Sequence, residues 1–224
     1  GFEVTLFDED YDSQNGVAAI STCIAEGYTA ICLNPTDPAA LVPALKEAKE
    51  AGIIIGLYSS DLPDESKQYR DFMCGTNDFL FGEIAAQTMM AAFPTVRDSK
   101  DVAQWATEDA MAIMEDFISL YGDEIQAVFC HWDTGATGVI QALKNAGIEG
   151  VYVIGIDGCS VGYDQVREGT QALCIGQSFS QMTQDAFTCI TKLMNGETLE
   201  SDVVWTEPDI VNAETIDNFP YPEW

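Results

Sequence analysis

The stretch "AVFCHWDTGATGVIQALKNAGIEGVYVIGID", residues 127–157, contains the repeating unit of this fold. Its two ends, 127–132 and 151–157, are short apolar runs typical of buried strands. Between them, residues 137–147 have the amphipathic pattern of a helix that ends at Gly147, a residue type that favours the helix C-terminus. A strand, a helix and a strand joined by short connections predict a parallel pair of strands with a crossover helix.

The same alternation extends along the rest of the chain in both directions. The patterns predict strands at 1–8, 30–35, 53–58, 71–75 and 172–177, and helices at 14–26, 38–51, 79–92, 107–120, 162–168 and 180–195. This is an α/β fold with more units than one sheet holds comfortably, so we predict two doubly wound parallel-sheet lobes. Lobe 1 comprises residues 1–76 and 178–207, and lobe 2 comprises residues 77–177 and 208–224.

Composition excludes several classes of partner. The 37 acidic and 9 basic residues give a net charge of −28, which repels nucleic acids and anionic membranes. No stretch approaches the roughly 20 apolar residues that span a bilayer. No export leader opens the sequence, so any such signal is expected to have been removed or not to be shown. The seven cysteines form no CxxC pair and are expected to be free buried thiols, which suggests a reducing or anaerobic habitat.

Motifs for catalysis and for metal binding are weak. No GxGxxG or GxxxxGK[ST] phosphate loop occurs. The single histidine, His131, makes a Cys/His metal site improbable, and its neighbour Asp133 is expected to line or support the structure. Residues 8–19 space three aspartates as a calcium loop does. They lack the glycine and the bidentate glutamate that such a loop needs, so a helix-capping turn is predicted instead. We expect no cofactor and no metal.

Several segments resemble the type I periplasmic sugar-binding proteins, the ribose- and galactose-binding branch of transporter solute receptors. They are "YDSQNGVAAISTCIAEGYTAICLNPTDPAALVPALKEAKEAGI" (11–53), "GTNDFLFGEIAAQTM" (75–89), "VFCHWDTGATGVIQALKNAG" (128–147), "VIGIDG" (153–158) and "IGQSFSQM" (175–182). The likeness covers nearly the whole chain in the right order. It implies two doubly wound lobes joined by a three-stranded hinge, with a ligand bound in the cleft and the lobes closing around it.

The resemblance implies ligand contacts at strand ends. Asp157 alone reads as an Asp-Gly turn, but the family places an acid there that accepts hydrogen bonds from ligand hydroxyls. Ser59 and Ser60 stand where the family strand ends in an acid and a polar or basic residue. Asp61, which follows them, either compensates for the lost acid or is a solvated loop residue. All four are predicted as ligand-binding residues.

Two tryptophans and one glutamine complete the predicted site. Trp132 stands where the family has an asparagine, and an indole offers one donor and no acceptor. Trp105 aligns with an aromatic residue that stacks on the sugar ring, although a core position is the alternative. Gln177 matches a family glutamine at the second crossing between lobes, where its amide both donates and accepts. Two indoles could clamp the apolar face of a pyranose.

The sequence also departs from the family pattern. In the family, a strand and a helix precede the segment equivalent to residues 1–8. Between residues 93 and 105, where the family has another strand, helix and loop, only "PTVRDSKDVAQ" is present. Each lobe therefore lacks the equivalent of its first strand–helix unit here: either the sequence omits part of the polypeptide, or a different arrangement fills the gap. A sheet without a central strand leaves backbone groups unpaired, which is costly when they are buried.

Together these features predict a non-catalytic, monomeric, extracytoplasmic solute-binding protein, either periplasmic or lipid-anchored at a bacterial surface. It would capture a small neutral sugar or polyol and deliver it to a membrane ABC permease. The alternative is the ligand-sensing domain of a signalling receptor or of a repressor. An enzyme is disfavoured because no catalytic constellation can be named. The changes at Ser59 and Trp132 leave the identity of the ligand open.

Overall fold

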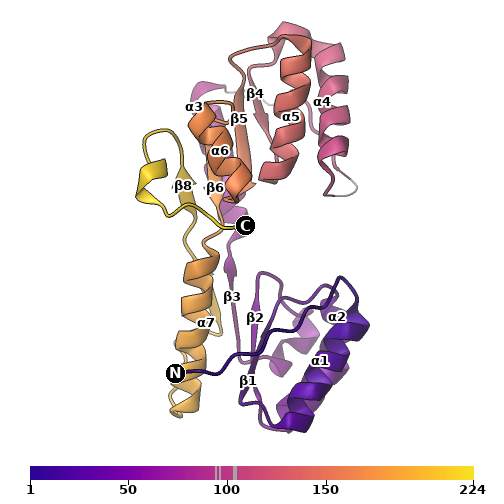
Figure 1. Cartoon of the computed structure of the whole chain (residues 1–224), viewed down its shortest axis with the longest axis vertical. Helices are drawn as coiled ribbons and strands as arrows, with labels where there is room; N and C mark the ends of the chain where they lie inside the picture. The colour runs from indigo at the N-terminus through magenta and orange to yellow at the C-terminus, as the bar shows by residue number, and fades with distance from the viewer. Residues whose placement is uncertain (94, 96, 103–104) are drawn as a thin grey trace. The chain divides into compact units, whose positions relative to one another are not determined.

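The computed structural model describes residues 1–93, 95, 97–102 and 105–224. The chain divides into two units (Figure 1). Unit 1 comprises Gly1–Thr76 and Phe179–Thr206, and unit 2 comprises Asn77–Ser178 and Glu207–Trp224. The chain therefore passes between the units three times. The two are described separately below.

Unit 1 is built on a four-stranded parallel sheet with the order β1-β2-β3-β7. Helices α1 and α2 pack on one face of this sheet and α7 packs on the other. The elements are β1 (Ala30–Leu33), β2 (Ile54–Tyr58), β3 (Phe72–Thr76), β7 (Val203–Thr206), α1 (Ser13–Glu26), α2 (Pro38–Glu50), α7 (Phe179–Met194) and the 3₁₀ helix η1 (Asp64–Tyr69).

The ends of α1 and α2 are set by local residues. The Asp12 carboxylate accepts a hydrogen bond from the backbone N–H of Gln14 at 2.9 Å and caps α1. Asp37 does the same for α2, accepting from Ala39 at 3.1 Å. Gly27 ends α1 with a φ of 72°, a conformation that is readily available only to glycine. The acidic stretch that resembled a calcium loop is therefore a helix cap, as predicted.

Unit 2 has a four-stranded sheet with the order β4-β5-β6-β8. The first three strands are parallel, as predicted, and β8 runs antiparallel to β6 at the edge of the sheet. Helices α4, α5 and α6 cover one face and α3 covers the other. The elements are β4 (Ala127–Phe129), β5 (Tyr152–Asp157), β6 (Leu173–Gly176), β8 (Asp209–Val211), α3 (Asp78–Ala92), α4 (Thr107–Tyr121), α5 (Asp133–Ala146) and α6 (Ser160–Glu168), with the short 3₁₀ helices η2 (Gly122–Glu124) and η3 (Ile216–Asn218).

Alternation along β5 explains why both faces of the unit 2 sheet carry helices. Val153 packs into the cluster formed by α4 and α5, whereas Ile154 packs against α3. Both side chains are 1% exposed or less. Successive residues of a strand point to opposite faces, so a strand that is apolar at every position must be covered on both sides.

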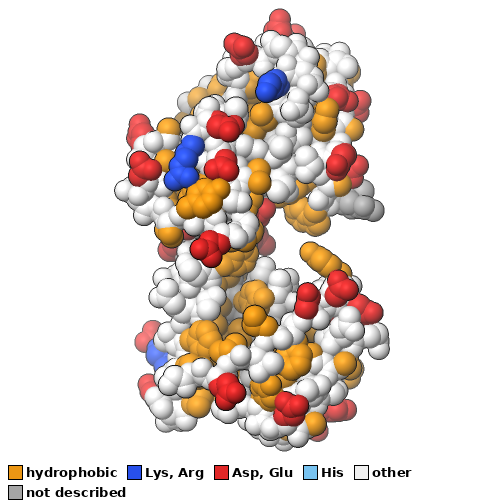
Figure 2. All heavy atoms as spheres, viewed as in Figure 1, with side chains coloured by type: hydrophobic (Ala, Val, Ile, Leu, Met, Phe, Trp, Pro, Cys, Tyr) orange, Lys and Arg blue, Asp and Glu red, His pale blue; other side chains and the backbone are white. Residues whose placement is uncertain are grey.

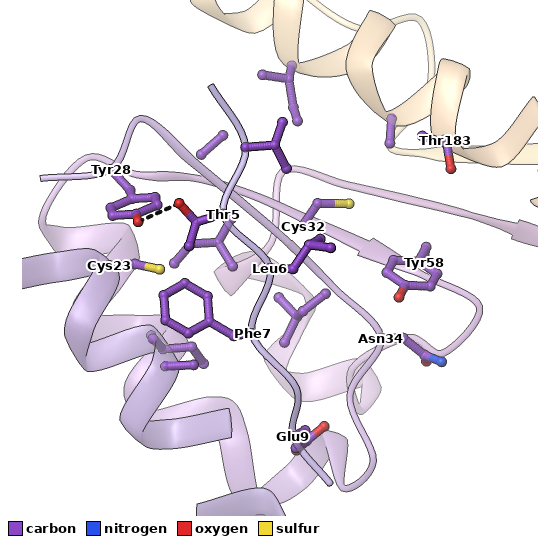
Figure 3. Close-up of a pocket in the computed structure, with 18 of the residues that line it drawn as sticks. Thr5, Leu6, Phe7, Glu9, Cys23, Tyr28, Cys32, Asn34, Tyr58 and Thr183 are labelled. Carbon is purple, nitrogen blue, oxygen red and sulfur yellow. Dashed lines mark hydrogen bonds between the residues drawn. The ribbon is translucent and has the colours of Figure 1, made fainter. Parts of the chain in front are cut away.

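The strand predicted at residues 1–8 does not form. This segment runs beside the sheet of unit 1 without strand structure, and β1 remains the edge strand. A cavity of about 1310 Å³ lies between the segment, α1, β1 and α7 (Figure 3). Alternating apolar residues favour a strand only when a neighbouring strand supplies hydrogen bonds, and none of the described residues does so here.

Side-chain contacts nevertheless hold the segment in place. The Tyr28 hydroxyl donates to Thr5 Oγ1 at 2.9 Å, and the Phe7 and Tyr28 rings lie 6.4 Å apart. Phe7 points towards α1, whereas Leu6 points to the opposite side, into the space beside β1 (Figure 3). The Leu6 side chain is 91% exposed. Apolar side chains consequently reach the surface of unit 1, as Figure 2 shows.

We expect this segment to be the least protected part of unit 1 in amide hydrogen exchange. Its N–H groups have no strand partner, whereas those of β2 lie between β1 and β3 in the sheet. Exchange followed by mass spectrometry should show residues 1–8 fully exchanged at the earliest time point and residues 54–58 strongly protected. Equal protection of the two peptides would contradict the unpaired arrangement.

In unit 2, the connection between α3 and α4 is the stretch where the sequence analysis found no equivalent of the family's strand and helix. Of residues 94–104, positions 94, 96, 103 and 104 lie outside the described residues, and the others form no helix or strand. Arg97 in this stretch pairs with Glu124, and Lys100 pairs with Asp116 at 2.7 Å. These ion pairs join the connection to η2 and to α4.

The remaining fold-level predictions concern cysteines and membranes. All seven cysteines are free thiols, as predicted, and six are buried. The prediction of burial is wrong for Cys32, which is exposed on the edge strand β1. Among the described residues, none of the helices combines the length and apolar character needed to cross a bilayer. Acidic side chains are spread over the face shown in Figure 2, with few basic ones between them.

Candidate functional site

Three of the predicted site residues follow three adjacent parallel strands. Trp132 lies shortly after β4, Asp157 is the last residue of β5, and Gln177 directly follows β6. These strands are neighbours in the sheet of unit 2. The carboxyl ends of parallel strands meet at one edge of a sheet, which is where open α/β sheets bind ligands. The structure therefore brings these three residues to the same edge.

Asp157 is held in an unusual backbone conformation. Its φ is 119°, and the next residue, Gly158, has a φ of 80°. A non-glycine residue with positive φ is uncommon and strained, and such strain concentrates at functional sites. Among the described residues only four non-glycine positions have positive φ, and two of them are Ser59 and Asp157. Both are strand-end residues that the sequence predicted to bind ligand, one in each unit.

Gln177 is bound directly to Asp157. Its side-chain amide Nε2 donates to Asp157 Oδ1 at 3.0 Å, and its backbone N–H donates to the Asp157 carbonyl at 2.7 Å. Both side chains are half-buried. The pair places a carboxylate and an amide side by side, and the amide oxygen and the other carboxylate oxygen can still accept hydrogen bonds.

The charge of Asp157 is sensitive to its surroundings. Burial raises the pKa of Asp157 to about 6, and the nearby carboxylate of Asp133 contributes to the rise, while the Gln177 hydrogen bond opposes both effects. Near neutral pH the group is therefore mainly ionised but not far from protonation. An ionised carboxylate accepts strong hydrogen bonds from hydroxyl groups.

The two predicted tryptophans meet each other. The rings of Trp105 and Trp132 lie 5.2 Å apart in an edge-to-face arrangement with an interplanar angle of 83°. Trp132 is 6% exposed and packs over Gly135, where an added Cβ would lie 2.3 Å from the indole. Trp105 is 77% exposed, so it is not a core residue. Its ring presents an apolar surface to solvent beside α5.

The indole nitrogen of Trp132 has no hydrogen-bond partner in the part of the chain that the structure describes. A buried indole N–H usually has a partner, so an unmet donor in this position is costly. The indole of Trp132 offers one donor and no acceptor, and it is largely buried. Trp132 supports Trp105 through its ring contact, and its predicted contact with a ligand stays a prediction.

In unit 1, Ser59 and Ser60 lie at the end of β2. Ser59 has a φ of 65°, and its N–H donates to the Cys74 carbonyl at 3.0 Å. The N–H of Ser60 donates to the Tyr58 carbonyl at 2.8 Å. Both side chains are half-buried. The backbone is thus fixed at the strand end, and hydroxyls occupy the two positions that the resemblance assigns to an acid and to a polar or basic residue.

Asp61 has a structural partner that the sequence did not reveal. Arg70 Nε donates to Asp61 Oδ1 at 2.6 Å and Nη2 donates to Oδ2 at 3.0 Å, which is a bidentate ion pair. Lys67 lies 3.5 Å from the same carboxylate. Asp61 therefore holds the loop after β2, and we do not include it among the residues proposed below to bind ligand.

Asp133 is the residue that sequence reasoning did not connect to the site. It is fully buried at the start of α5 and accepts hydrogen bonds from the backbone N–H groups of Gly158 and Cys159, at 2.9 and 3.3 Å. These residues directly follow Asp157. The structure confirms a supporting role, and the available signal was an acid beside a helix start, where an N-terminal carboxylate is favoured.

The residues that could hold a metal ion are dispersed. Within residues 1–93, 95, 97–102 and 105–224, no group of three or more His, Cys, Asp or Glu side chains is placed to bind one. The side chains described near the unit 2 sheet edge make a hydrogen bond between Gln177 and Asp157 and a ring contact between Trp105 and Trp132.

Comparison with known proteins identifies the family. The sequence profile of the "Periplasmic binding protein domain" matches residues 1–96 and 94–198. This chain belongs to the periplasmic binding protein family. The match confirms the resemblance inferred from the sequence segments, and the α/β fold with parallel sheets agrees with it.

Curated relatives of this periplasmic binding protein include two pentose or pentitol binders. It is 28% identical to the xylitol-binding protein of Mycolicibacterium smegmatis over 89% of this chain and 66% of that protein. It is 24% identical to the D-xylose-binding periplasmic protein of Escherichia coli over 90% of this chain and 72% of that protein. The chain thus spans about two thirds of the xylitol-binding relative.

Solved structures show the same fold. A periplasmic solute-binding protein of an ABC transporter from Actinobacillus succinogenes, with bound D-allose, has a TM-score of 0.82 at 23% identity and covers 97% of this chain and 88% of that one. A sugar-binding protein of an ABC transporter from Bacillus halodurans also has a TM-score of 0.82, at 21% identity, covering 94% and 86%. Both relatives are longer than the aligned region.

Proposed function

We propose that this periplasmic binding protein captures a small neutral sugar or polyol outside the cytoplasm and delivers it to an ABC permease. The observation that carries the proposal is the meeting of Trp132, Asp157 and Gln177 at the carboxyl edge of three adjacent strands. The relatives are binding proteins rather than enzymes, and the ligands in their names are sugars and polyols. This supports the same class of ligand here.

The chemistry of the edge suits hydroxyl groups. The Asp157 carboxylate accepts hydrogen bonds from two hydroxyls, and the Gln177 amide oxygen accepts from a third. The exposed ring of Trp105 offers an apolar face to the C–H groups of the ligand. Ser59 and Ser60 are proposed to add neutral hydrogen bonds. Closure of the lobes on the ligand and lipid anchoring at the cell surface are further parts of this proposal.

Net charge favours an uncharged ligand. At −28 the chain repels anions at long range, and Asp157 would repel a phosphate or carboxylate at contact. We therefore expect neutral pentoses, hexoses or polyols to bind and sugar phosphates not to bind. The same charge disfavours the repressor alternative, because a DNA-bound protein needs positive charge.

Titration calorimetry against a ligand panel tests the proposal. The panel contains D-xylose, xylitol, D-ribose, D-allose and myo-inositol, with ribose 5-phosphate as the charged comparison. We expect saturable binding of at least one neutral member, with a dissociation constant of about 10 µM or tighter, and no heat from the phosphate. Absence of saturable binding across all neutral members would overturn the proposed function.

A further inference from the structure

The carboxylate of Asp133 receives hydrogen bonds from four donors. Besides the N–H groups of Gly158 and Cys159, Gln171 Nε2 donates to Oδ1 at 2.9 Å and the Cys174 thiol donates to Oδ2 at 3.1 Å. The residue is 0% exposed. These donors come from the loop between β5 and α6, from the approach to β6 and from β6 itself, so one side chain joins three segments of unit 2.

Two glycines make room for this carboxylate. A Cβ at Gly155 on β5 would lie 2.3 Å from Asp133 Oδ1, and a Cβ at Gly162 on α6 would lie 2.2 Å from Oδ2. Any larger residue at either position would displace the carboxylate. The strand that ends at Asp157 and the helix that follows it thus both close around Asp133.

A buried acid of this kind lowers the stability of the fold relative to apolar residues of similar volume. Burial raises the pKa of Asp133, although all four hydrogen bonds favour its ionised form. Each of these four partners is a donor, so a protonated Asp133 would lose at least one of the bonds. Apolar residues could fill this space without a buried charge. In some proteins, buried ionic groups are retained because they favour one conformation over its alternatives.

We propose that Asp133 is the positioning residue for the ligand-binding carboxylate: by holding the N–H groups of Gly158 and Cys159, it fixes the strained turn in which Asp157 faces the ligand. The inference rests on the proposed function, because it assigns Asp157 to ligand binding. The backbone of Asp157 has a φ of 119°, and strain of this kind persists only where the surroundings enforce it. The two hydrogen bonds to Asp133 supply that restraint immediately after the strained residue.

Asp133 also acts on Asp157 as a like charge. The thiols of Cys130 and Cys159 also lie near Asp157, and burial raises the pKa of both. These thiols are neutral near pH 7, so Asp133 is the charged neighbour that disfavours ionisation of Asp157. A ligand hydroxyl that donates to Asp157 would favour its ionised form and so oppose the effect of Asp133.

Two substitutions test the proposal. Asp133→Asn keeps the shape of the side chain but removes its charge and leaves one oxygen in place of two to accept from the four donors. Gly162→Ala leaves every polar group intact and pushes on Asp133 Oδ2. Both are expected to weaken binding of the best ligand from the panel about 10-fold or more. Gly82→Ala on α3, where an added Cβ has nothing within 4 Å, is the matched control and should bind like wild type.

A spectroscopic readout separates positioning from mere support of the fold. In Asp133→Asn, NMR titration should move the Asp157 pKa down towards its ordinary value, because the like charge is gone, while circular dichroism shows a folded protein. Wild-type affinity in either folded variant would overturn the proposal. If Asp157→Asn itself binds normally, then the ligand-binding assignment of Asp157 fails instead.

Measurements on the unmodified protein keep the proposal testable if both variants misfold. Gly158 and Cys159 donate to a fully buried acceptor, so their amides should exchange far more slowly than that of exposed Glu149 in the ligand-free protein. Exchange of the two amides as fast as that of Glu149 would show that the turn is not held, and would overturn the inference.

Discussion

Replacing Asp157 by asparagine is expected to weaken ligand binding at least about 100-fold, because hydrogen bonds from hydroxyls to a carboxylate each contribute roughly 1.5–3 kcal/mol. The change removes the charge and keeps the shape. Asparagine tolerates positive φ as well as aspartate does, so the strained turn should survive. It can also still accept the hydrogen bond from Gln177 Nε2. The loss would therefore report on the charge of the carboxylate.

The same variant is expected to be more stable than the wild type at neutral pH. Burial holds the pKa of Asp157 at about 6, above the ordinary 3.8. At pH values between these two pKa values, the folded state binds more protons than the unfolded state. The free energy of unfolding therefore falls as pH rises from about 4 to about 6. The neutral amide of the variant carries no such penalty. We expect a gain on the order of 1–3 kcal/mol near pH 7 and none below about pH 4.

Calorimetric titration and urea unfolding at about pH 4 and about pH 7.5 measure both effects. Asp123→Asn is the matched control, since Asp123 is exposed on η2. Loss of binding together with loss of stability would point to misfolding rather than to a missing ligand contact. A variant that binds like wild type would contradict the role of Asp157.

Much of this fold follows from local patterns, and the exceptions have physical causes. The apolar runs predicted every strand of the two parallel ladders except β7, where no strand was predicted. The run at residues 1–8 has a strand pattern but forms none, because a strand also needs a partner and the structure leaves a cavity there. The antiparallel direction of β8 is set by the path of the chain between distant elements, and no local sequence pattern predicts that path.

The site was predictable to the extent that it depends on strand ends. Asp157 and Gln177 follow neighbouring strands, and their resemblance to family positions singled them out. Asp133 was harder to connect, because its four donors lie 25 to 41 residues further along the chain. The role of Asp61 depends on Arg70, whose other partner is 132 residues away. Contacts of this range are set by topology rather than by sequence spacing.

Arg70 is the side chain whose loss should destabilise unit 1 most. Its side chain is 1% exposed, and it lies between the loop after β2 and the start of β7. Besides the bidentate pair with Asp61, Nη1 donates to the Asp202 carbonyl at 3.1 Å and to Asp202 Oδ2 at 3.0 Å. Although burial opposes ionisation of Asp61, the Arg70 guanidinium holds the pKa of that carboxyl below its usual value.

We expect Arg70→Met to lower the free energy of unfolding by about 3 kcal/mol, because removing one partner leaves Asp61 partly buried with only Lys67 nearby. The Asp202 side chain is 69% exposed, so solvent screens its ion pair with Arg70. Most of the lost stability is therefore expected to come from the pair with Asp61. Lys100→Met, which breaks an exposed ion pair with Asp116, is the control and should cost less than about 1 kcal/mol.

Urea unfolding followed by circular dichroism measures the difference between these two variants, and the pH dependence identifies its source. The depressed pKa of Asp61 stabilises the folded state above about pH 4, and that contribution disappears as Asp61 is protonated at lower pH. The difference in free energy of unfolding between wild type and Arg70→Met should therefore become smaller at acidic pH. A gap that stays constant with pH would mean that packing of the arginine stem, rather than its ion pairs, holds the loop that carries Ser59 and Ser60.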